Sequence, residues 1–185
     1  MSLTNTRERY GTLSVTLHWL MLVLLAAVYA CIEFRGIFPK DSAERELMKT
    51  LHFMLGLTVF LLVWLRLFLR LARPTPRIVP APPAWQTGLA HLVHWALYAL
   101  MIGLPLAGWT ILSAADKPIP FYGFELPPLV QPDKDLARFV KGWHEWFGAL
   151  GYWLIGLHAV AGLYHHYVRK DNTLLRMLPG KDQAL

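Results

Sequence analysis

The chain has 185 residues, of which 55% are hydrophobic and 16% are charged, with a formal net charge of +6. A soluble domain usually carries about 25% charged residues, so the composition excludes an ordinary soluble protein and predicts one small polytopic membrane domain over 1–185. The single cysteine, Cys31, excludes an internal disulfide, a C-x-x-C-H haem attachment and a cysteine-based metal cluster.

The first apolar stretch runs from about 13 to 32 and contains His18 and Cys31. Cys31 is interpreted as a small apolar helix residue. A lipoprotein cleavage site before it is the weaker alternative, because Tyr29 and Ala30 fit such a site poorly and the apolar run is longer than that of a signal peptide. A short charged loop, 33–46, follows.

The second stretch runs from about 47 to 71 and contains His52 and Gly56. It is followed by RPTPRIVPAPPAW, in which the prolines rule out a continuous helix and indicate a connector. The third stretch, about 89–112, opens with His91 and His94 on one helical face. A longer loop with several prolines, 114–138, leads to the last stretch.

The fourth stretch runs from about 139 to 168 and contains His144 and His158, fourteen residues apart. Fourteen residues are close to four helical turns, so both imidazoles project from one face, about 21 Å apart along the axis. One histidine toward each end of a membrane helix is an arrangement that could hold two haems across a bilayer.

Each stretch is long enough for a hydrocarbon core, which needs about 20 residues, so the predicted fold is all-α, a four-helix transmembrane bundle.

One side of the membrane would carry ten basic residues against three acidic ones. This side would contain the amino-terminal tail, the proline-rich connector with its flanks and the carboxy-terminal tail. Its charged residues are Arg7, Arg9, Arg66, Arg70, Arg73, Arg77, Arg169, Lys170, Arg176 and Lys181, against Glu8, Asp171 and Asp182. The other side has the remaining eight basic and nine acidic residues.

This asymmetry places both termini in the cytoplasm by the positive-inside rule. Because the basic residues flank apolar spans, the net charge is interpreted as a topology signal and not as a nucleic-acid surface.

Depth in the bilayer predicts how the buried histidines pair. His18 and His158 lie toward the cytoplasmic end of their helices, whereas His52 and His144 lie about two turns from the opposite surface. Each pair would clamp one iron.

An ionisable side chain in a membrane helix is a functional candidate by default, although neutral histidines bonded between helices are an alternative. His94 competes for the cytoplasmic iron, and zinc is disfavoured because a structural zinc site needs four converging ligands.

Glycines follow three of these histidines by four residues: Gly56, Gly148 and Gly162. Small residues there would let a flat macrocycle approach the helix, although ordinary small-residue packing is the alternative. Gly151 lies between the two histidines of the fourth stretch on nearly the same face. The pattern is incomplete, because Leu22 occupies the corresponding position after His18.

His165 and His166 end the fourth stretch beside Arg169 and Lys170. They are either an interfacial cap or proton donors to a quinone, since histidine titrates near neutral pH. Arg66 and Arg70 are further candidates at this end, and a periplasmic quinone site near Glu145 is left open.

With these segments, the chain resembles the bacterial cytochrome b-561 family of four-helix di-haem membrane cytochromes. The resemblance covers nearly the whole chain and is carried by LHWLM, EFRGIFP, LHFMLGL, GLAHLVHWALY, KGWHE, GYWLIGLHAVAGLYHHY and KDNTLLRMLP. It implies two non-covalent b-type haems with two histidine ligands each, in agreement with the depth argument, and electron exchange with the quinone pool in the bacterial inner membrane. The nearest branch resembles the superoxide oxidases, which pass an electron from periplasmic superoxide to ubiquinone.

Two histidines on each iron leave no open coordination site, so electron transfer is favoured over oxygen chemistry. Basic residues near the periplasmic haem could steer anionic superoxide: Arg35, Lys40, Lys134, Arg138 and Lys141. That side carries a net charge of about −1 by the count above, and Arg35 and Lys141 could equally pair with haem propionates.

Two other functions remain open from sequence. One is a haem-bearing subunit that links a soluble hydrogenase or dehydrogenase to the quinone pool. The other is a non-redox transporter or sensor whose histidines only bond between helices. The sequence leaves undecided the haem potentials, the quinone and its side, and the oligomeric state.

Overall fold

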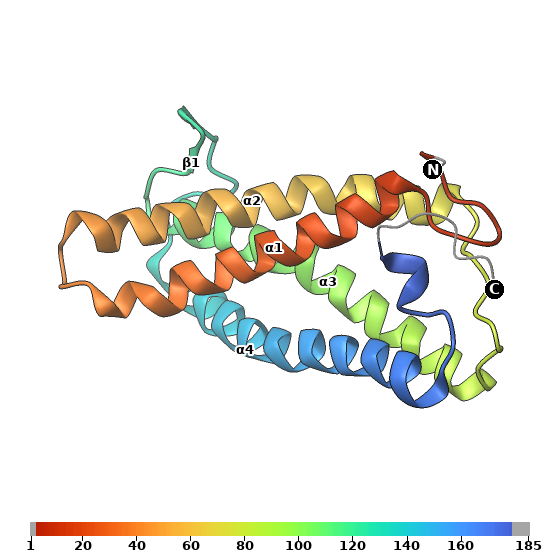
Figure 1. Ribbon diagram of the computed structural model, residues 1–185. Coiled ribbons are helices and arrows are strands. Elements are labelled where there is room, and N and C mark those ends of the chain that lie inside the picture. Colours follow the sequence, from red (N-terminus) through yellow and green to blue (C-terminus); the bar gives the residue numbers. More distant parts are fainter. Residues whose placement is uncertain (1–2, 179–185) are drawn as a thin grey trace. The chain divides into compact units, whose positions relative to one another are not determined.

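The computed structural model describes residues 3–178, and it is dominated by helices (Figure 1). Within this range four helices are long and apolar enough to cross a membrane. They are α1 (Thr12–Phe34), α2 (Ala43–Ala72), α3 (Ala84–Ala114) and α4 (Lys134–Tyr164). Short helical turns η1 (Arg35–Ile37), η2 (His165–Arg169, a π-helical turn) and η3 (Leu175–Met177) add to them. Lys181 and Asp182, which enter the charge count, lie outside the described residues.

All four helices begin before the predicted apolar stretches, and polar residues cap the starts of α2 and α4, whereas α4 ends at Tyr164 and continues as the π-helical turn η2. Asp133 precedes α4, and its side chain accepts hydrogen bonds from the backbone N–H groups of Asp135 and Leu136, at 2.9 and 3.0 Å. Ser42 precedes α2 and accepts from the backbone N–H of Arg45 at 3.2 Å. These bonds satisfy N–H groups that a helix start leaves free, so α4 begins at Lys134 instead of near 139.

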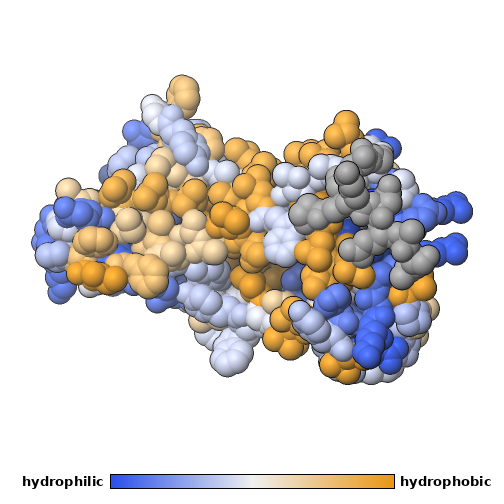
Figure 2. All heavy atoms as spheres, viewed as in Figure 1, coloured by the Kyte–Doolittle hydropathy of each residue, from blue (hydrophilic) through white to orange (hydrophobic). Residues whose placement is uncertain are grey.

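The outer faces of the helices are apolar, as Figure 2 shows for the visible side. Large side chains such as Trp153, Phe68 and Val23 are 78%, 65% and 64% exposed. Exposed apolar surface on this scale is unusual for a soluble protein and matches helices surrounded by lipid.

The chain forms two compact units, and each of the four helices contributes a segment to both. The first unit contains Met1–Leu20, Trp64–Tyr98 and Gly151–Leu185. The second contains Met21–Val63 and Ala99–Leu150. His18, His94 and His158 belong to the first unit, and His52 and His144 belong to the second.

In the first unit, the segment after α4 is tied to the proline-rich connector. The backbone N–H of Asn172 donates to the Val79 carbonyl at 3.2 Å, and the Val79 N–H donates to the Asn172 side-chain oxygen at 2.9 Å. The indole N–H of Trp19 on α1 donates to the Met177 carbonyl at 2.7 Å. These bonds fix the segment that carries His165 and Asp171.

In the second unit, the loop between α3 and α4 contains a small antiparallel hairpin, β1 (Pro120–Phe121) and β2 (Phe124–Glu125). Strand β1 is labelled in Figure 1. The turn places Gly123 at φ +90°. Ile119 packs with Leu57 of α2 and Leu112 of α3. The sequence predicted only a loop here, because two-residue strands are too short for a detectable alternation.

Candidate functional site

In the second unit, the structure brings His52 of α2 and His144 of α4 together. Their ring centroids lie 6.2 Å apart, with an interplanar angle of 74°. A metal–imidazole bond of about 2.0 Å on each side of one ion places two ring centroids about 6 Å apart. The separation therefore suits two histidine ligands of one metal ion.

The proton position on His52 is fixed by its neighbour. Nδ1 of His52 lies 3.0 Å from the Val28 carbonyl of α1. A carbonyl only accepts, so Nδ1 donates the proton, and Nε2 keeps the lone pair that a metal needs. This hydrogen bond to the non-ligating nitrogen is typical of metal-binding histidines. No sequence pattern points to this bond, because the acceptor lies on another helix.

His144 is partly buried, and its Nδ1 atom is inaccessible to solvent. Its backbone neighbour on α3 is Leu104. A Cβ atom on Gly108 of α3 would lie 3.6 Å from Cε1 of His144. Gly108 thus lies directly beside this ring, and it could not be found from the sequence because it is not at a fixed offset from a histidine on its own helix.

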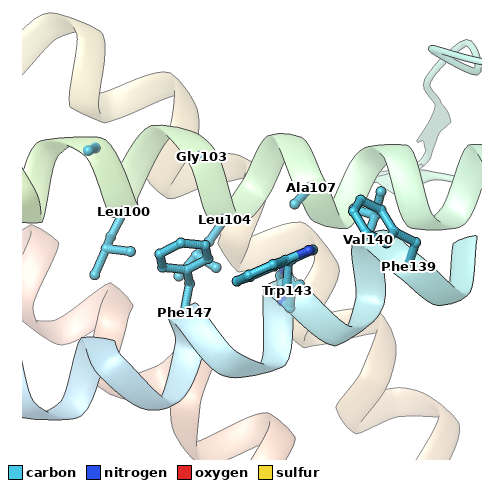
Figure 3. A pocket seen from close by; sticks show the side chains of 10 residues that line it. Leu100, Gly103, Leu104, Ala107, Phe139, Val140, Trp143 and Phe147 are labelled. Atoms are coloured by element: carbon cyan, nitrogen blue, oxygen red, sulfur yellow. The ribbon is translucent and has the colours of Figure 1, made fainter. Parts of the chain in front are cut away.

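A cavity of about 370 Å³ lies beside His144, between α3 and α4 of the second unit. Trp143 and Phe147 extend from α4 toward α3 (Figure 3). Apart from His144, the lining is apolar: Ala99, Leu100, Gly103, Leu104, Ala107, Phe139, Val140, Trp143 and Phe147. Such a lining suits an apolar ring system or acyl chain.

The glycines that follow the histidines have open space beside them. A Cβ atom at Gly56, Gly148 or Gly162 would meet no atom within 4 Å. The same is true of Gly103 and Gly142, so open space is not a special property of the three glycines that follow the histidines. Their role beside a macrocycle stays a prediction from spacing.

In the first unit, three histidines approach one another. The ring centroid of His158 lies 6.0 Å from that of His18 and 5.2 Å from that of His94. The His18–His158 distance suits ligands on opposite sides of one ion, whereas the His94–His158 distance is about 1 Å shorter than such a pair needs. Nδ1 of His94 is buried and has no hydrogen-bond partner among residues 3–178.

His18 also contacts an arginine of the same unit. Nη2 of Arg66 on α2 lies 2.9 Å from Nδ1 of His18. The Nη1 atom of Arg66 is buried without a hydrogen-bond partner in the described chain. Arg70 follows one turn further along α2. Its Cζ atom lies 5.7 Å from the centroid of the Trp95 ring and 5.5 Å from that of the Tyr98 ring.

At the end of α4, His165 is held by a buried carboxylate. Its Nδ1 lies 2.5 Å from Oδ2 of Asp171, whose side chain is 1% exposed. Burial alone would raise the pKa of Asp171, but hydrogen bonds from His165 and Thr173 outweigh it and hold that pKa below its usual value. His166 instead stacks edge-on with Tyr167, at 4.7 Å between centroids.

Of the five basic residues expected to steer superoxide, two lie in exposed ion pairs. Lys141 pairs with Glu145 at 3.4 Å, and Arg138 pairs with Asp135. Such pairs are worth little energetically, but they lower the local positive charge.

Across residues 3–178, no three His, Cys, Asp or Glu side chains form a chelating group.

The chain resembles known proteins over nearly its whole length. Residues 9–180 match the family model described as prokaryotic cytochrome b561. The chain is 42% identical over 172 residues to cytochrome b561 homolog 1 of Escherichia coli (strain K12), covering 93% of this chain and 98% of that protein. It is 41% identical over 174 residues to a Yersinia pestis protein named "Probable superoxide oxidase CybB", covering 94% and 98%. A third relative, cytochrome b561 homolog 2 of Escherichia coli (strain K12), is 30% identical over 185 residues, covering 100% and 98%.

Two findings identify the family of this chain: its four membrane-length helices with paired histidines, and its match to the family model over almost the entire length. This multi-pass membrane protein belongs to the prokaryotic cytochrome b561 family, whose members are helical bundles that bind b-type haem.

Proposed function

We propose that the chain holds two b-type haems, one between His18 and His158 and one between His52 and His144, and transfers electrons from superoxide to ubiquinone. The observation that carries the proposal is the pair of centroid separations, 6.0 and 6.2 Å. The name of the Yersinia pestis relative supports superoxide as the donor.

The surroundings of the two histidine pairs are compatible with electron transfer through bound haem. Bound b-type haem supplies one-electron transfer, and two histidine ligands leave no open position for oxygen. The Val28 carbonyl orients His52 and raises the basicity of its ligating nitrogen. Open space beside Gly56, Gly148 and Gly162, each four residues after a histidine, is compatible with a large ring near the ligands.

Ubiquinone reduction also requires protons. We assign their delivery to His165, with His166 as a second candidate, because His165 is held in place by Asp171 at the end of α4. We infer an inner-membrane location, and the charge asymmetry supports cytoplasmic termini; with that orientation, these histidines would lie on the cytoplasmic side.

The proposal is tested with the purified chain in detergent, supplied with a superoxide source and a short-chain ubiquinone. Sustained quinone reduction above the uncatalysed rate is expected, with no soluble partner. A His165→Gln, His166→Gln double variant should slow the reaction with unchanged haem content, whereas the exposed His91→Gln should not. Haem-loaded protein that never exceeds the uncatalysed rate would favour a subunit served by a soluble dehydrogenase.

A further inference from the structure

The side chain of Arg66 is only partly satisfied in the first unit. It lies within the membrane span of α2, it donates to Nδ1 of His18 at 2.9 Å through Nη2, and its Nη1 atom is buried without a partner in the described chain. No ion pair among residues 3–178 includes it. A charged group in a membrane helix normally pairs with another polar or charged group.

The bond between Arg66 and His18 is incompatible with iron ligation by His18. A guanidinium group only donates, so Nδ1 of His18 accepts and the imidazole proton lies on Nε2. A nitrogen that carries a proton cannot bind a metal. His52 shows the opposite arrangement, because Val28 accepts from its Nδ1 and leaves Nε2 free.

Ligation by His18 therefore releases Arg66, and the freed guanidinium needs an anionic acceptor beside the same histidine. Arg70 is already placed over Trp95 and Tyr98, so it competes less for such an acceptor. The haem implied for this site brings two carboxylates of its own. A guanidinium binds a carboxylate through two parallel hydrogen bonds.

We propose that Arg66 is a haem-binding residue that pairs with a haem carboxylate at the His18–His158 site, exchanging its bond to His18 for this ion pair when haem binds. The inference rests on the proposed function, because it assumes that His18 is an iron ligand.

The test compares haem b with its dimethyl ester, which lacks both carboxylates. Protein is purified from cells that cannot make haem and titrated with either compound, with binding followed at the Soret band. A charge-assisted hydrogen bond contributes about 1.5–3 kcal/mol, so the wild type should bind haem b at least about tenfold more tightly than the ester. Arg66→Gln should lose this preference, and Arg66→Lys should keep part of it.

Arg73→Gln is the matched control, because Arg73 is exposed just beyond α2 and carries the same charge. It should behave like the wild type. The inference is overturned if Arg66→Gln keeps the full preference for haem b. It is also overturned if the wild type binds both compounds equally, a result that needs no variant. Absence of any Soret band in the wild type would instead refute the proposed haem sites themselves.

Discussion

At the scale of single residues, the two histidine pairs differ in what holds them. A carbonyl accepts from His52, whereas a guanidinium donates to His18. Spacing in the sequence predicted which histidines approach one another, and the structure brings those residues together; their role as ligands stays a prediction. The hydrogen-bond partners were not predictable, because Val28 and Arg66 lie on other helices at no fixed offset.

Gly108 should control the space beside His144. Gly108→Ala is expected to keep the wild-type haem content, because its Cβ would make an ordinary contact of 3.6 Å with Cε1 of His144. Gly108→Leu should push the ring aside and lower the haem-to-protein ratio by about half if two sites are filled. A Leu variant with full haem content would show that Gly108 does not control the space beside this ring.

Asp171 should stabilise the end of α4 in a pH-dependent way. Its pKa is lower in the folded protein than the usual value of about 3.9. Its contribution is therefore present above that value and lost as the pH falls through the folded pKa. Asp171→Asn should lower the free energy of unfolding at neutral pH by about 1–3 kcal/mol. The Tm of this variant should also fall less steeply than that of the wild type as the pH is lowered.

The exposed Asp116→Asn is the control for that measurement. If Asp171→Asn and Asp116→Asn give the same Tm values between pH 7 and pH 2, the buried carboxylate does not stabilise the fold.

At the scale of elements, apolar content located the four helices but not their ends. The end of a helix depends on which polar side chain caps it, and Asp133 and Ser42 lie outside the apolar runs. The β1–β2 hairpin was not predicted because its stability comes from packing against α2 and α3. In the hairpin turn, Tyr122 hydrogen-bonds with Thr58 of α2 at 3.0 Å.

The hairpin turn requires glycine at position 123. Its φ of +90° is unfavourable for a side chain, so Gly123→Ala should destabilise the protein by about 1–2 kcal/mol. Gly142→Ala in α4, where a Cβ meets open space, should leave Tm unchanged or raise it. Equal Tm values for the two variants in thermal unfolding would contradict the strained turn.

At the scale of the whole molecule, the charge asymmetry predicts that both termini lie in the cytoplasm. A fluorescent protein fused after the last residue should therefore fluoresce, and alkaline phosphatase fused after Asp116 should be active. The reverse pattern of the two reporters would invert the assignment of the quinone and superoxide sides.

If two histidine pairs hold two haems, purified protein should have a defined haem-to-protein ratio that falls when either pair is broken. We expect about two haems per chain in the wild type. We expect about one in His52→Ala or His144→Ala and about one in His18→Ala or His158→Ala, with His91→Ala unchanged. A wild-type ratio near zero, or single variants that keep both haems, would show that these histidine pairs do not hold the haems.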